Sequence, residues 1–272
     1  MDSVHFSAGA PPTVGTHAVI TRVDDLRWRA VEDDRVIGHG EASRRPDGRV
    51  FLSIDTWHGA VFDRLATAML ADLPSPLYTM VDEADHDLTA RWERAGLTVR
   101  RREREYLVAT DPLVTGLDTG LDTGPAPSDV TILGLGAARE AALREVYEAV
   151  RAEVDARVGW DSMPVEVPAR PDGAPMDPSK YAVAEAADRY VGLVRVVARR
   201  RHARIGLVAV REGLRRRGIA RAMLAEVLGA LHRGEVEAAS AEVDERNSAA
   251  TALFEGIGAQ RVSSAVEMVR GV

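Results

Sequence analysis

The chain has 272 residues, of which 46% are hydrophobic, and its formal net charge at pH 7 is −7. This length corresponds to one large or two small domains, and the apolar fraction is enough for a sizeable core. The absence of cysteine excludes a disulfide scaffold, a Cys-ligated zinc site and a thiol nucleophile. We expect a cytoplasmic protein, because no apolar run is long enough to span a membrane and the first residues lack a signal-peptide pattern.

The first half of the sequence mixes strand and helix patterns. We expect strands at 27–31, 35–43 and 50–54, a helix at 59–73, a strand at 77–81, a helix at 88–94 and a strand at 99–109. Residues 114–128 then repeat a Gly-Leu-Asp-Thr unit, include Pro125 and Pro127, and have no hydrophobic period. This composition predicts a flexible linker between domains at 1–113 and 129–272.

The second half has a similar order of elements. We expect a helix at 137–156, a mostly irregular segment at 158–187, strands at 190–198 and 204–210, a helix at 219–231, a strand at 238–243, a helix at 249–255 and a strand at 261–269. This order predicts an α/β domain with a mixed sheet.

The two halves also resemble each other in sequence. The segment from Val81 to Gly96 aligns without a gap on the segment from Val243 to Gly258, and Ala-Met-Leu-Ala occurs at both 68–71 and 222–225. Self-similarity over a whole half indicates a duplicated domain.

The segment from Arg211 to Arg221 carries the strongest chemical signal. A strand ends, a loop rich in arginine follows, and a helix begins at Gly218. A helix N-terminus offers unpaired amide donors and partial positive charge, arginines add bidentate donors, and glycine allows an anion to approach the backbone. The pattern is that of a pyrophosphate site, although a solvated basic loop has the same composition.

Two motifs resemble those of the GNAT superfamily, the acetyl-CoA-dependent N-acetyltransferases. Arg215-x-x-Gly218-x-Ala220 resembles the family's pyrophosphate signature, and the segment from Asn247 to Gly258 looks like its Asn-x-x-Ala-x-x-Leu-Tyr-x-x-x-Gly ending. The resemblance implies a tandem protein of two GNAT-like domains. Each would have a mixed, mostly antiparallel sheet flanked by helices, with splayed strands in the second domain.

The resemblance further implies acetyl-CoA as cosubstrate, with pantetheine inserted between strands that end near Val210 and Val243. The residues that it implies for cofactor binding are Leu207, Val208, Ala209 and Val210 for pantetheine, Arg215, Arg216, Arg217, Gly218, Ile219, Ala220 and Arg221 for the pyrophosphate, and Asn247 and Phe254 in the second motif.

The first half lacks these site residues. Aligned on the repeated Ala-Met-Leu-Ala, Val61 falls at Arg215 and Arg64 falls at Gly218, while Asp85 replaces Asn247. We therefore expect a degenerate first domain that does not bind acetyl-CoA. It would cover the second domain and wall the substrate cleft, or else the two domains would be independent.

Acetyl transfer by direct attack needs a neutral amine and a proton for the departing thiolate. Glu242 is the first candidate base. Asp244 is the second, although it could simply end its strand. Phe254 stands where the family has a tyrosine that protonates the thiolate, so another group or water must do this. Tyr181 and Tyr190 are possible substitutes, and both also fit as packing residues.

Trp160 and Asp161 lie in the segment where this family builds its acceptor pocket. Together they could hold a cationic amine through the ring face and the carboxylate. Alternatively, Trp160 anchors the loop to the core. No metal-ligand spacing occurs, and the chemistry requires no metal.

We expect an N-acetyltransferase that acts on a primary amine of a small molecule. A non-catalytic acyl-CoA-binding sensor is the alternative, favoured by Phe254. We expect no membrane or nucleic-acid partner, because the balance of charge is acidic and the arginine-rich turn at 199–202 has no interleaved aromatic residues. The sequence does not indicate an oligomeric state.

Overall fold

The computed structural model describes residues 17–45, 47–115, 127–160, 163 and 175–271. In chain order, its elements are β1 (Val19–Asp24), β2 (Arg27–Glu32), β3 (Arg35–Arg44), β4 (Val50–Asp55), α1 (Gly59–Asp72), β5 (Leu77–Asp82), α2 (His86–Arg94), β6 (Thr98–Ala109), α3 (Pro112–Thr115), β7 (Thr131–Leu133), α4 (Glu140–Asp155), the 3-10 turn η2 (Pro178–Lys180), β8 (Tyr181–Ala186), β9 (Arg189–Arg199), β10 (His202–Val210), the 3-10 turn η3 (Glu212–Leu214), α5 (Ile219–Arg233), β11 (Ala238–Asp244), α6 (Ser248–Gly256) and β12 (Gln260–Arg270).

The chain forms two compact units. The first unit holds the residues up to Arg100 together with those from Glu267 onward, and the second unit holds Arg101–Val266. Both boundaries fall inside a strand, β6 or β12. The sheet of each unit is therefore completed by part of the last strand of the other sequence half. These boundaries differ from the predicted domain limits because strand pairing is non-local and leaves no mark in the sequence of one strand.

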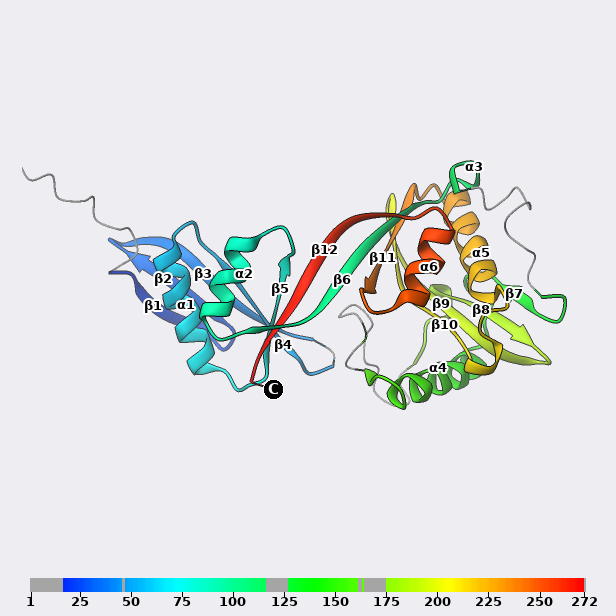
Figure 1. The fold of residues 1–272 in the computed structure, drawn as a ribbon, viewed down its shortest axis with the longest axis horizontal. Helices are drawn as coiled ribbons and strands as arrows, with labels where there is room; N and C mark the ends of the chain where they lie inside the picture. Colours follow the sequence, from blue (N-terminus) through cyan, green and yellow to red (C-terminus); the bar gives the residue numbers. More distant parts are fainter. Residues whose placement is uncertain (1–16, 46, 116–126, 161–162, 164–174, 272) are drawn as a thin grey trace, which may run out of the picture. The chain divides into compact units, whose positions relative to one another are not determined.

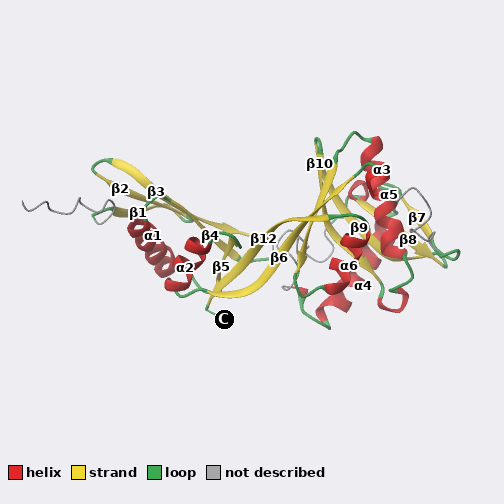
Figure 2. Ribbon diagram, turned by 45° about the horizontal axis from the view of Figure 1, so that its top comes forward, coloured by secondary structure: helices red, strands yellow, loops and turns green. Residues whose placement is uncertain are grey.

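The first unit has the strand order β1-β2-β3-β4-β5-β12-β6. Strands β1 to β4 are antiparallel, and β4 pairs with β5 in parallel. Helices α1 and α2 cover the same face of these strands (Figure 2). The buried side of α1 consists of residues spaced three or four apart, as expected of an amphipathic helix: Val61, Phe62, Leu65, Ala66 and Met69.

The second unit has the order β12-β6-β11-β10-β9-β8-β7. Strands β7 to β10 are antiparallel, and β10 pairs with β11 in parallel. Helices α5 and α6 lie on one face of this sheet and α4 lies on the other (Figure 1). The mixed α/β architecture with sheets flanked by helices is the predicted one.

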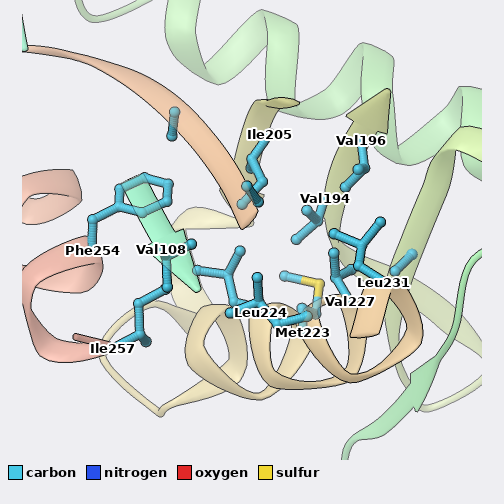
Figure 3. Close-up of a cluster of buried hydrophobic side chains, with 14 of the residues drawn as sticks. Val108, Val194, Val196, Ile205, Met223, Leu224, Val227, Leu231, Phe254 and Ile257 are labelled. Atoms are coloured by element: carbon cyan, nitrogen blue, oxygen red, sulfur yellow. The ribbon is translucent and has the colours of Figure 1, made fainter. Parts of the chain in front are cut away.

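Two apolar layers hold the second unit together. One lies between the sheet and helices α5 and α6, where Met223, Leu224 and Val227 of α5 point toward Val194 and Ile205 on the strands (Figure 3). The other lies beneath α4 and contains Leu143, Tyr147 and Val150 together with Leu193 and Leu207. The sheet is thus buried on both faces, which fixes the strands that line the site described below.

Several elements were not expected from the sequence. The segment predicted to be mostly irregular, 158–187, contains strand β8, in which Tyr181, Ala182, Val183 and Ala184 are all buried. A strand buried on both faces shows no alternation, and alanine has low strand propensity, so the pattern carried no strand signal. Strands β1 and β7 were also missed. Most of the predicted linker, 114–128, lies outside the described residues.

Within the described ranges, no helix is long and apolar enough to cross a membrane.

Candidate functional site

Strands β10 and β11 separate part-way along their length. They pair at three rows, His202 with Ala238, Ala203 with Ala239 and Arg204 with Ser240, and no row is paired beyond these along the fully described strands. The remainder of β10 stays paired with β9 on its other edge, through Val210 opposite Gly192. The parallel pair is therefore splayed, as predicted, and its opening is bordered by the edge of β10 from Leu207 to Val210.

The loop after β10 turns sharply before helix α5. Arg216 has φ +64°, and Gly218, the N-cap of α5, has φ +82° and ψ −4°. The side chain of Gly218 is only hydrogen, and an added Cβ would meet no atom within 4 Å, so the space in front of the helix N-terminus is open. Because the first amide groups of a helix lack intrahelical acceptors, this opening suits an anion such as a pyrophosphate. The residues present therefore fit the diphosphate group of acetyl-CoA.

The loop arginines differ in their partners. The Arg215 side chain donates from Nε to the Val210 carbonyl at 3.0 Å and from Nη2 to Glu153 at 3.1 Å. Arg217 donates to both carboxylate oxygens of Asp129, at 2.7 and 3.0 Å, and this contact holds the pKa of Asp129 below its ordinary value. Arg216 is exposed. Sequence reasoning missed Glu153 and Asp129, because neither lies near the motif along the chain.

The two predicted catalytic carboxylates lie on β11 beside the splay, and each already has a partner. Glu242 forms an ion pair with Arg204 of β10. Asp244 accepts the Arg246 N–H at 2.8 Å and so turns the chain after β11. Asp82 makes the same turn after β5, where it accepts the Ala84 N–H at 2.9 Å. The strand-ending role of Asp244 is thus visible in the structure, and its role as a base stays a prediction.

Asn247 and Phe254 are both placed by helix α6. Asn247 is the N-cap, and its side-chain oxygen accepts the Ala250 N–H at 3.0 Å. Phe254 is buried and stacks on Tyr106 of β6 with ring centroids 6.1 Å apart. The Tyr106 hydroxyl donates to Glu255 at 3.1 Å.

The acceptor-side candidates lie around α4. The Trp160 ring is buried and packs edge-on against Tyr147 at 5.7 Å, while its backbone N–H donates to Asp155 at 2.7 Å. This geometry is that of a loop anchor. Asp161 lies outside the described residues.

The two substitute tyrosines differ in their hydrogen bonding. Tyr190 accepts the Arg139 N–H at 3.1 Å through its hydroxyl. The hydroxyl of the fully buried Tyr181 has no partner among the described residues. Tyr181 is therefore the one of the two whose hydroxyl is uncommitted.

The first unit has the same splay but a different lining. Strands β4 and β5 pair at Val50–Leu77 and Phe51–Tyr78, and no further row is paired along these fully described strands. Beyond these rows, the buried Thr79 hydroxyl donates to the Leu52 carbonyl at 2.9 Å. The corresponding residue after the last paired row of the second unit is Ala241, which has no hydroxyl.

The start of α1 also corrects the predicted alignment. Helix α1 begins after His58, its N-cap, as α5 begins after Gly218. His58 is therefore the counterpart of Gly218, and the placement of Arg64 there was wrong, because the shared Ala-Met-Leu-Ala lies at different turns of the two helices. An added Cβ at Gly59 would lie 2.6 Å from the Arg91 guanidinium, so a side chain occupies the space near this helix start.

Comparison with known proteins follows the same lines. The sequence model of the acetyltransferase (GNAT) family matches residues 143–259, which include the splay, the arginine loop and helix α6. The chain carries a GNAT acetyltransferase domain. No curated protein matches the sequence. The GNAT match supports acyl transfer as the general chemistry.

Solved GNAT structures resemble the whole chain in fold. A GCN5-related N-acetyltransferase from Sphaerobacter thermophilus is 17% identical, with a TM-score of 0.67 over 92% of this chain and 82% of that one. A tandem GNAT protein from the clavulanic acid biosynthesis pathway is 14% identical, with a TM-score of 0.60 over 96% and 84%. A GCN5-related N-acetyltransferase from Kribbella flavida is 13% identical, with a TM-score of 0.58 over 95% and 90%. The predicted tandem GNAT fold is thereby confirmed.

Proposed function

We propose that this protein is an acetyl-CoA-dependent N-acetyltransferase whose second unit transfers the acetyl group to a primary amine of a small molecule. The observation that carries the proposal is the left-handed turn at Gly218, which opens the N-terminus of α5 directly beside a splayed strand pair. An anion cradle next to an unpaired strand edge suits a ligand that has both a diphosphate and an amide-containing arm.

The residues that would hold the cosubstrate follow from this placement. The open backbone around Gly218, with Arg216 exposed beside it, would bind the pyrophosphate, and the β10 edge from Leu207 to Val210 would hydrogen-bond the pantetheine amides. When bound, acetyl-CoA supplies the acetyl group. The chain's own contribution is to orient it and to receive the proton that the amine loses.

Negative charge beside the splay supports an amine as the acceptor. In the register of β11 with β6, Glu242 lies opposite Glu105 and Asp244 lies opposite Glu103, so the four carboxylates share one face. Such a face favours a cationic amine over an anionic acceptor. Glu242 is our first choice for the base. In that role it would exchange its partner Arg204 for the amine.

The first unit is proposed not to bind acetyl-CoA. The Thr79 hydroxyl already satisfies the Leu52 carbonyl at its splay, and the Arg91 guanidinium lies at the start of α1. A cytoplasmic location and the absence of nucleic-acid and membrane partners remain parts of this proposal.

Calorimetric titration of acetyl-CoA into the full chain tests the cosubstrate. We expect micromolar binding that Gly218→Glu abolishes, because a carboxylate would then project into the space of the anion. Gly48→Glu is the matched control, since Gly48 also has a positive φ, +86°, and no atom within 4 Å of an added Cβ. The wild type failing to bind, or both variants binding equally, would refute the assignment.

The alternative, a non-catalytic acyl-CoA-binding protein, rests on Phe254, which has no proton to give to a thiolate. Release of free thiol from acetyl-CoA with a panel of primary amines separates the two functions. Binding without thiol release from any amine would favour the sensor.

A further inference from the structure

Glu153, near the end of α4, joins three points of the arginine loop. One carboxylate oxygen accepts Arg211 Nε at 2.6 Å. The other accepts the Glu212 backbone N–H at 2.9 Å and Arg215 Nη2 at 3.1 Å. The Glu153 side chain is only 16% exposed, so these bonds are largely shielded from water.

The same contacts brace the loop against the strand. Arg215 also donates from Nε to the Val210 carbonyl at 3.0 Å, which joins the end of the loop to the end of β10. Arg157, just past α4, pairs with Glu212 at the middle of the loop. In Figure 1 the segment between β10 and α5 passes beside α4. Both ends of η3 are thus fastened to one helix.

The loop needs such support because its backbone is strained. Arg216 is a non-glycine residue at φ +64°, which costs of the order of 1 kcal/mol and persists only where the surroundings hold it. Arg216 and Gly218 set the direction of the amide groups at the start of α5. A released loop would relax at Arg216 and turn those amides away from a bound anion.

Charge makes the role of Glu153 testable by sign. A carboxylate close to an anion site should weaken anion binding, so its removal should tighten binding if charge alone mattered. We propose that Glu153 is instead a positioning residue, which holds the loop of Arg211 to Arg217 in the conformation that binds the pyrophosphate. This inference rests on the proposed function and assigns Arg215 to bracing the loop rather than reaching the phosphate.

Asp129 provides the matched control. It is a second carboxylate bonded to a loop arginine, Arg217, but it is 60% exposed and contacts the loop at that one side chain. Asp129→Asn and Glu153→Ala remove the same charge from the same loop. Electrostatics alone therefore predicts the same direction for both variants, whereas a clamp at Glu153 predicts opposite directions.

The experiment is calorimetric titration of CoA and of 3′-phospho-ADP, the nucleotide part without pantetheine, into the full-length variants. We expect Glu153→Ala to weaken both ligands by a similar factor, about tenfold or more, as charged hydrogen bonds are lost. Glu153→Gln, which keeps one acceptor oxygen, should fall between it and the wild type. Asp129→Asn should bind as the wild type does or more tightly. With any amine that is acetylated, Glu153→Ala should raise KM for acetyl-CoA and change kcat less than about twofold.

Three results would overturn the clamp: unchanged or tighter binding in both Glu153 variants, equal weakening by Asp129→Asn, or loss of CoA affinity without loss for 3′-phospho-ADP. Glu153→Gln decides the matter if Glu153→Ala does not fold, as judged by its circular dichroism. A wild type that binds neither ligand would instead refute the proposed function, and the clamp with it.

Discussion

Asn247 and Asp85 begin two different helices in the same way. Their backbone angles are φ −85°, ψ 73° and φ −86°, ψ 76°. The Asn247 side-chain oxygen accepts the Ala250 N–H at 3.0 Å, and Asp85 accepts the Leu88 N–H at 2.9 Å. The two halves thus share a helix cap as well as a sequence pattern. What differs between the two caps is a full negative charge.

Substitutions at Asn247 separate capping from cofactor binding. Asn247→Ala should lower the free energy of unfolding by about 1 kcal/mol, because the Ala250 amide loses its acceptor. Asn247→Asp should keep the cap and the stability, and should weaken acetyl-CoA binding if this residue lies near the phosphates as the family resemblance implies. Urea unfolding and calorimetry measure the two effects. Unchanged affinity in Asn247→Asp would leave Asn247 as a cap alone.

A buried ion pair in the first unit gives a prediction about stability. The fully buried Glu267 binds Arg100 at 2.6 Å and Arg49 at 3.3 Å. Glu267→Gln should destabilise the protein by about 3 kcal/mol, because two guanidinium groups with little exposure lose their counter-charge. The urea midpoint of this variant measures the loss.

An exposed pair serves as its control. Glu226 and Arg233 lie 3.5 Å apart with side chains 42% and 68% exposed. Glu226→Gln should cost less than about 1 kcal/mol. Equal effects of the two substitutions would mean that the Glu267 cluster adds nothing beyond an ordinary surface pair.

The sequence was most informative where a feature is local. The arginine loop, the glycine at the start of α5 and the Asn247 motif each lie within a dozen residues, and together they predicted the splay and the family. The β8 strand was missed because burial on both faces removes the alternation that identifies a strand. The alignment of Arg64 with Gly218 was wrong because a four-residue match can fall on different turns of equivalent helices.

Features that join distant segments could not be predicted. Glu153 reaches a loop more than fifty residues away, and Thr79 caps a carbonyl on a strand before α1. Their residue types are common, so no spacing distinguishes them from solvated surface residues. The same holds for the completion of each sheet by a strand of the other half, which depends on topology rather than on any motif.

The Asp129–Arg217 pair predicts how one charge effect responds to pH. The pair holds the Asp129 pKa below its ordinary value, so Asp129 is fully ionised above the ordinary carboxyl pKa. Its contribution is present there and is lost only as the pH falls through the lowered value. The ratio of CoA affinities between Asp129→Asn and wild type should therefore be the same at pH 5.5 and pH 8. A ratio that changes between these values would mean that another group titrates with the pair.

Phe254 offers a test of how the thiolate obtains its proton. Phe254→Tyr places a hydroxyl where the family has one, so we expect a higher kcat for thiol release and an unchanged KM for acetyl-CoA. Because Phe254 is buried against Tyr106, the new hydroxyl should also cost about 1–3 kcal/mol of stability unless it finds a partner. Phe62→Tyr is the control, since Phe62 is equally buried against an aromatic ring, Trp92, in the first unit. It should lose stability and keep kcat. A kcat that falls in Phe254→Tyr would show that the proton comes from elsewhere, and Tyr181, whose buried hydroxyl has no partner among the described residues, would be the next residue to replace by phenylalanine.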